Sequence, residues 1–163
     1  MEPVFAYNHS RPKNPHAKSQ RHMTGMIHRL LARFYHFRGM TWRHWGHRYN
    51  DPSAYHRAEQ DFTRAVEMLP TFVQALYDRG LLRWRELADG EGAEADLTRV
   101  LELDPKRAEA WFNRALAREV IGDLAGAVAD FRRYLSEGND PQWQAISRRQ
   151  IAVLEAISTR EEQ

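Results

Sequence analysis

Three segments of the sequence carry the same pattern: RAEQDFTRAVEMLP at residues 57–70, GAEADLTRVLELDP at residues 92–105 and GAVADFRRYLSEGN at residues 126–139. Each has an alanine, an aspartate three positions later, then Phe or Leu, and an arginine three positions after the aspartate. The shared residues are Ala58, Asp61, Phe62 and Arg64; Ala93, Asp96, Leu97 and Arg99; and Ala127, Asp130, Phe131 and Arg133. Because the aspartates lie 35 and then 34 residues apart, the chain contains a repeated structural unit.

A second helical segment precedes each of these stretches. These segments are WRHWGHRY from Trp42, LYDRGLLRW from Leu76 and WFNRALARE from Trp111. The residues Asn50-Asp51-Pro52 predict the end of one helix and the start of the next, with Asp51 as N-cap and Pro52 in the first helical position. Gly122-Asp123 predicts the same boundary in the third unit. Each unit is therefore expected to be two helices joined by a turn.

The pattern resembles that of the tetratricopeptide repeat family, which places Trp, Leu, Gly and Tyr on its first helix and Ala, Phe, Ala and Pro on its second. In the first copy the matching residues are Trp42, Trp45, Gly46, Tyr49, Ala58, Phe62, Ala65 and Pro70. The second copy matches with Leu76, Arg79, Gly80, Arg83, Ala93, Leu97, Val100 and Pro105, and the third with Trp111, Arg114, Ala115, Arg118, Ala127, Phe131 and Tyr134. The resemblance covers residues 39–141. It implies an all-α fold, a right-handed solenoid of helix pairs, in which each unit buries its apolar face against its neighbours.

The two ends of such a stack need covers. Apolar residues at helical spacing predict one amphipathic helix at each end: Ile27, Leu30, Leu31, Phe34 and Phe37 before the repeats, and Trp143, Ile146, Ile151, Leu154 and Ile157 after them. We expect about eight helices in all. The expected segments are a basic extended arm (1–22), an N-terminal amphipathic helix (23–38), three repeats (39–72, 73–107 and 108–141) and a C-terminal capping helix (142–163).

The second and third copies place arginine where the family often has Leu or Tyr. We predict that Arg79 and Arg114 pair with the repeated aspartates Asp61, Asp96 or Asp130 between helices. Such pairs would hold helices together rather than bind a ligand.

Charge is divided unevenly along the chain. Residues 1–50 contain nine Arg or Lys against one acid, whereas residues 51–163 contain fifteen against twenty-one. Basic segments of this kind bind acidic protein surfaces, RNA or anionic lipid. We therefore expect a docking role for the cations of the arm and the helix after it, namely Arg11, Lys13, Lys18, Arg21, Arg29 and Arg33.

Composition and motifs argue against catalysis. The chain has no cysteine, which excludes disulfides and thiolate chemistry. It contains no glycine-rich phosphate loop and no nucleophile elbow. His44 and His47 could begin a metal site, but no His-Glu-x-x-His run accompanies them. The prediction is a protein that is not an enzyme, with no cofactor, no metal and no small-molecule substrate.

The resemblance also implies a binding groove. In this family the first helix of each repeat lines the concave surface. The corresponding residues here are Arg43, His47, Asn50, Gln74, Tyr77, Leu81, Trp84, Arg85, Glu109, Phe112, Leu116 and Glu119. Aromatic and arginine side chains are frequent hot spots of protein interfaces. Chaperone-binding members grip a terminal carboxylate with Lys, Asn and Arg, but Asp78, Glu109 and Asn113 occupy three of those positions, so we expect no such clamp.

The favoured function is a non-enzymatic scaffold, or an accessory or assembly subunit of a larger complex, with one or more proteins as partners. One alternative is an RNA- or ribosome-associated factor, in which residues 21–49 contact phosphates and stack on bases. The other is a peripheral adaptor on an anionic membrane surface, attached through residues 24–38. We expect a cytoplasmic location, free or peripheral to a membrane or a large complex.

Overall fold

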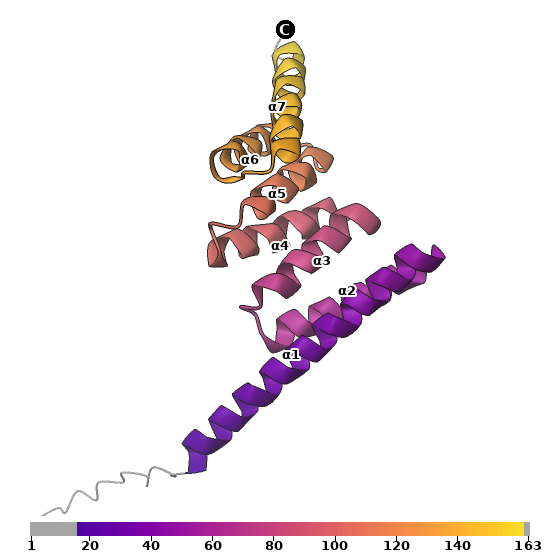
Figure 1. The fold of residues 1–163 in the computed structure, drawn as a ribbon, viewed down its shortest axis with the longest axis vertical. Coiled ribbons are helices and arrows are strands. Elements are labelled where there is room, and N and C mark those ends of the chain that lie inside the picture. Colours follow the sequence, from indigo (N-terminus) through magenta and orange to yellow (C-terminus); the bar gives the residue numbers. More distant parts are fainter. Residues whose placement is uncertain (1–15, 162–163) are drawn as a thin grey trace, which may run out of the picture.

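A computed structural model describes residues 16–161, and the side chains of residues 23–160. Its seven helices are α1 (His16–Tyr49), α2 (Pro52–Met68), α3 (Val73–Glu86), α4 (Gly90–Leu103), α5 (Ala108–Val120), α6 (Leu124–Glu137) and α7 (Pro141–Glu161). There is no strand between residues 16 and 161. Successive helices form hairpins that stack along the long axis of the molecule, with α7 at the end of the stack (Figure 1). The all-α solenoid predicted from the sequence is confirmed.

Aspartates begin the second helix of each hairpin. Asp51 accepts a hydrogen bond from the backbone N–H of Ser53, and Pro52 is the first helical residue, as predicted. Asp89 caps α4 through the N–H of Gly92, and Asp123 caps α6 through the N–H of Gly126. These bonds satisfy backbone donors that have no partner within the helix.

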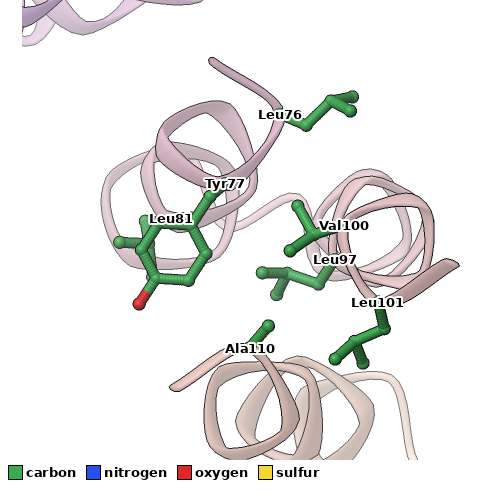
Figure 2. Close-up of a cluster of buried hydrophobic side chains, with 7 residues drawn as sticks. All are labelled: Leu76, Tyr77, Leu81, Leu97, Val100, Leu101 and Ala110. Atoms are coloured by element: carbon green, nitrogen blue, oxygen red, sulfur yellow. The ribbon is translucent and has the colours of Figure 1, made fainter. Parts of the chain in front are cut away.

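The core lies between the stacked hairpins and is divided into clusters along the stack. Figure 2 shows the central cluster, to which α3, α4 and the start of α5 contribute Leu76, Tyr77, Leu81, Leu97, Val100, Leu101 and Ala110. A second cluster, built by α5, α6 and α7, contains Phe112, Phe131, Tyr134 and Leu154. Each hairpin thus buries its apolar residues against the next hairpin, as expected for a repeat architecture.

The first helix differs from the prediction. The expected amphipathic helix at 23–38 and the first helix of repeat 1 form one continuous helix, α1, so the described chain has seven helices instead of about eight. No proline interrupts this segment, and Gly39 remains helical. Residues 16–22, expected to be extended, are the first turns of α1, and residues 1–15 of the predicted arm lie outside the described part.

The N-terminal half of α1 does not cover the first repeat. It extends past the end of α2 (Figure 1), and every residue from Met23 to Leu31 is exposed. Ala32 is the first buried residue of α1 within the part whose side chains are described. The apolar residues predicted to cap the stack therefore lie on the surface.

The register of the first hairpin also differs from the sequence alignment. A Cβ added to Gly80 would contact Leu97 and the carbonyl of Ala93, and one added to Gly39 would contact the equivalent residues of the first hairpin, Phe62 and the carbonyl of Ala58. Gly39, and not Gly46, therefore corresponds to Gly80. Gly46 packs against Tyr55 instead.

The C-terminal helix covers the last repeat with part of its apolar face. Leu154 is buried, and Trp143 and Ile151 pack against the same cluster. Ile146 and Ile157, predicted on this face, remain exposed. None of the helices within residues 16–161 has the length and apolar character that crossing a bilayer requires.

Candidate functional site: the inner face of the first helices

The predicted arginine–aspartate pairs are present and tie the helices together. Arg79 donates two hydrogen bonds to Asp96, of 2.9 and 2.6 Å, and Arg114 donates two to Asp130, both of 2.8 Å. In the first hairpin Arg38 holds Asp61 in the same two-point geometry. These three aspartates are buried. The Arg79 and Arg114 pairs therefore belong to the interior of the solenoid, whereas the side chain of Arg38 is 40% exposed.

The same arginines reach the preceding hairpin. Arg79 donates to Thr63 on α2, and Arg114 donates to Thr98 on α4, at 3.1 and 3.0 Å. One turn later, Arg83 contacts Glu59 and Asp96, and Arg118 repeats this with Glu94 and Asp130. This ionic unit recurs between successive hairpins, so it helps to fix how they stack.

Six of the twelve predicted groove residues lie on one side of the first helices. We call this side the inner face and define it by Arg43, His47, Trp84, Arg85, Glu109 and Glu119. Hydrogen bonds connect it from helix to helix: Arg43 of α1 donates to Glu86 of α3, and Arg85 of α3 donates to Asn113 of α5. Glu119 of α5 accepts from Gln150 of α7 at 3.0 Å. Polar contacts therefore join each first helix to the next along this face, and α5 to α7.

Tyr77 lies beneath this face. Only 9% of it is exposed, and its hydroxyl accepts a hydrogen bond of 3.0 Å from the side-chain amide of Asn113. The guanidinium of Arg107 lies 4.1 Å from the centre of the ring. Burial raises the pKa of the Tyr77 phenol above its usual value, and Arg107 opposes that rise. Leu81, one turn further, is also buried. Tyr77 and Leu81, predicted to line the groove, are therefore buried beneath the inner face.

Phe112 does not offer a free aromatic surface. It is 5% exposed and stacks on Trp143 of α7, with ring centres 4.7 Å apart. The prediction that Phe112 is an exposed anchor for a partner is therefore wrong, because the capping helix covers it. Leu116 also packs against this cluster.

Trp84 and Arg85 form the aromatic part of the inner face that remains accessible. Trp84 is half-buried, and the guanidinium of Arg85 lies 5.0 Å from its ring centre. Arg85 itself is exposed. The indole N–H of Trp84 is buried and has no hydrogen-bond partner within the described residues, so the accessible part of the side chain is its ring.

A buried carboxylate joins α1 to α3. The side chain of Glu86 is only 7% exposed, and its Oε1 accepts from Arg43 and lies 3.0 Å from His47 Nε2. The Nδ1 of His47 lies 3.3 Å from the hydroxyl of Tyr55. His47, considered in the sequence as half of a metal pair with His44, is thus hydrogen-bonded to protein groups. Among residues with described side chains, no three His, Asp or Glu form a metal-binding group.

Asn50 does not lie on the inner face. It follows α1 with a φ of 51°, the left-handed conformation that asparagine tolerates at helix ends. Asn50 therefore forms the turn between α1 and α2.

The alignment of the three repeats did not predict a second row of contacts, which joins α1, α3 and the residue before α5. His36 Nε2 lies 2.7 Å from Asp78, which also accepts from Gln74, and Gln74 in turn accepts from Arg107. With Gly39 equivalent to Gly80, His36 is the counterpart of Tyr77, and its contact with Asp78 matches that of Tyr77 with Asn113. The repeated Arg-Gly pair at 38–39 and 79–80 was the available signal.

The predicted docking cations are described only in part. Arg11 and Lys13 lie outside the described residues. Lys18 and Arg21 lie in α1, but their side chains are not described. Arg29 and Arg33 are exposed on α1, and neither forms an ion pair with a carboxylate in the described part of the chain.

The helix pairs and their repeated ionic unit define a helical-repeat solenoid. The family model for the tetratricopeptide repeat matches residues 85–142. Residues 85–142 therefore match the tetratricopeptide repeat, and the described chain has the fold of that family, as the sequence predicted.

Solved structures show the same fold. The Arabidopsis OM64 TPR domain is 19% identical, with a TM-score of 0.65, over 77% of this chain and 97% of that domain. The first TPR of Spaghetti (RPAP3), bound to the HSP90 peptide SRMEEVD, is 21% identical with a TM-score of 0.60, over 74% and 95% of the two chains.

One further solved structure covers more of this chain. The Yersinia enterocolitica type III secretion chaperone SycD, in complex with a peptide of the translocator YopD, is 16% identical with a TM-score of 0.59, over 91% of this chain and 99% of that one. No curated protein matches the sequence significantly.

Proposed function

We propose that this protein is a non-enzymatic scaffold or accessory subunit that binds an extended segment of a partner protein on its inner face. The observation that carries the proposal is the set of polar contacts along the inner face, which joins the successive first helices α1, α3 and α5, and α5 to α7. A partner lying along this face would meet arginines on α1 and α3 and glutamates on α5.

The chemistry of the inner face suits a peptide. Arg85 beside the half-buried Trp84 offers a guanidinium and an aromatic surface together, a combination frequent at interface hot spots. Exposed His47 and Glu109 supply polar contacts on either side. The similar structures of Spaghetti and SycD were both solved with bound peptides, which supports peptide binding by this chain as well.

The mode of recognition is proposed to differ from the carboxylate clamp. Two positions where clamp members carry basic or amide groups for the ligand are Asp78 and Asn113, and both are buried. Asp78 is engaged with His36 and Gln74, and Asn113 with Tyr77. The partner segment is therefore expected to bind through internal residues and not through a terminal carboxylate.

Selection from a displayed peptide library tests the proposal. Peptides selected on the full chain should bind with Kd values of about 1–100 µM by fluorescence polarisation, the range of modest interfaces. Arg85→Glu should weaken them at least about tenfold. The matched control is Arg99→Glu, an exposed arginine on α4 whose one ion pair among the described side chains is with Glu102 of the same helix. Equal losses in both variants, or none in either, would reject the inner face as the binding site.

A further inference from the structure

We propose that α1 carries a second docking surface, on the side facing away from the repeats, that binds the surface of an anionic phospholipid bilayer. We call this surface the outer strip and define it by Met23, Ile27, Leu30, Phe34, Phe37 and Trp45. All six side chains are exposed, and Phe37 is 72% exposed. The strip goes beyond the function proposed above, since it shares no residue with the inner face.

The packing of α1 fixes where the strip lies. Ala32, Gly39 and Gly46 are buried, and they recur every seven residues. Added Cβ atoms would lie 2.7 Å from the Phe62 ring at Gly39 and 2.5 Å from Tyr55 at Gly46. The small residues therefore face α2. At 3.6 residues per turn, Phe34 and Phe37 lie about half a turn away, on a side where no helix between residues 16 and 161 covers them.

The strip is an amphipathic surface of unusual size for a water-exposed helix. From Met23 to Trp45 it is about 33 Å long at 1.5 Å per residue. With Met26 and Leu31 at its edges it covers roughly 140° of the helix, wider than the narrow seam of a two-stranded coiled coil. Isolated apolar residues on a surface need no explanation, but a contiguous apolar area of this extent marks an interaction site.

The charges beside the outer strip indicate which kind of surface it binds. The sequence has no acidic residue from residue 3 to residue 50. Arg29 and Arg33 are exposed on α1 beside the strip and without an ion pair in the described chain. A second copy of this chain would bring arginines against arginines along its own strip, with no carboxylate to compensate. An anionic bilayer complements both the apolar strip and the arginines beside it, because it has an apolar interior under a layer of negatively charged headgroups.

Shape favours a bilayer over a protein helix. From Met23 to Leu31 no other helix flanks α1 (Figure 1), so this part of the strip is a convex ridge without a groove to receive a partner helix. A fluid bilayer accommodates such a ridge, with the apolar side chains entering the boundary between headgroups and acyl chains.

The other end of the strip has a composition suited to the headgroup region. There a hollow of about 420 Å³ is lined by Arg38, Thr41, Trp42, Trp45 and Arg57. The guanidinium of Arg57 lies 4.8 Å from the centre of the Trp42 ring. Tryptophan prefers the membrane–water interface, and an arginine beside it can meet a lipid phosphate.

Vesicle flotation of the full chain tests the proposal. The vesicles contain phosphatidylcholine alone, or phosphatidylcholine with about 30% phosphatidylserine. We expect binding to the anionic vesicles at least about tenfold stronger than to the neutral ones, and weaker in 0.5 M salt. Phe34→Ser/Phe37→Ser should reduce anionic binding at least about tenfold. Val153→Ser/Ile157→Ser, which removes two exposed apolar residues of α7, should leave it unchanged.

The double phenylalanine variant keeps every cation, so it distinguishes binding through the outer strip from binding through charge attraction alone. If this variant binds anionic vesicles as well as the native chain does, the basic residues act without the strip and the proposal is overturned. Absence of binding by the native chain would do the same. A dimer in light scattering that the phenylalanine variant abolishes, without vesicle binding, would assign the strip to a second copy. Inner-face peptide binding is measured separately, so its failure leaves this test intact.

Discussion

Arg114 and Asp130 form a buried two-point ion pair, with two hydrogen bonds of 2.8 Å between the guanidinium and the carboxylate. The pair repeats that of Arg79 and Asp96, and a threonine of the preceding hairpin binds each arginine. Removing Arg114 takes both of these hydrogen bonds from the buried Asp130 and leaves it with the single bond from Arg118.

Arg114→Leu is therefore expected to lower the free energy of unfolding by about 3 kcal/mol. Urea denaturation followed by circular dichroism measures it. The control is Arg132→Leu, which breaks the exposed pair of Arg132 with Glu155 and should cost less than about 1 kcal/mol. Equal costs in the two variants would contradict a structural role for the buried pair.

The first hairpin packs through Gly39. Gly39→Ala places a Cβ 2.7 Å from the Phe62 ring, so we expect a loss of about 1–3 kcal/mol in the free energy of unfolding. In the same helix, Gly25 has nothing within 4 Å of its added Cβ. Gly25→Ala should preserve stability and raise helicity, because alanine favours helix over glycine. If thermal melts show Gly39→Ala to be as harmless as Gly25→Ala, the register described for α1 and α2 is wrong.

Two buried phenols should make the protein sensitive to alkaline pH. Burial raises the pKa values of Tyr77 and Tyr134 above the ordinary 10.0, so the folded state favours the neutral phenol. This contribution to stability is complete below pH 10 and is lost as pH rises through the folded-state pKa. Absorbance at about 295 nm should show some tyrosines ionising later than the rest, and Tyr77→Phe should remove part of that late change. Ionisation of all six tyrosines in one step near pH 10 would refute this.

The buried state of Asp78 and Asn113 gives a prediction about ligand ends. A peptide selected for the inner face should bind equally well, within about a factor of two, with a free C-terminal carboxylate and with an amidated end. The peptide SRMEEVD, which Spaghetti binds, should bind this chain more weakly than about 100 µM. Isothermal titration calorimetry measures both. A loss of affinity that depends on the terminal carboxylate would indicate a clamp after all.

The repeats and their ion pairs could be predicted from the sequence because local spacing encodes them. Asp61, Asp96 and Asp130 recur at nearly constant intervals, and the arginines that bind them lie one helix earlier. The caps Asp51 and Asp123 follow from residue preferences that act within one turn.

The continuity of α1 and the burial of Phe112 could not be predicted in this way. Trp42, Trp45, Gly46 and Tyr49 match the family pattern well enough to suggest a repeat start, yet the longer first hairpin shifts the register to Gly39. Phe112 occupies a groove position in the family pattern, but Trp143 of α7 stacks on its ring and covers it. Both outcomes depend on packing between distant segments, which a local pattern does not contain.

The central claim, that a partner segment lies along the inner face, is tested most directly by the tryptophan indole N–H resonances in an NMR titration with a selected peptide. We predict that Trp84 shifts most, because its half-buried ring lies beside the exposed Arg85 on the inner face. Trp42 and Trp45, which line the hollow between α1 and α2, should remain unchanged. Shifts confined to Trp42 and Trp45, with Trp84 unaffected, would contradict it.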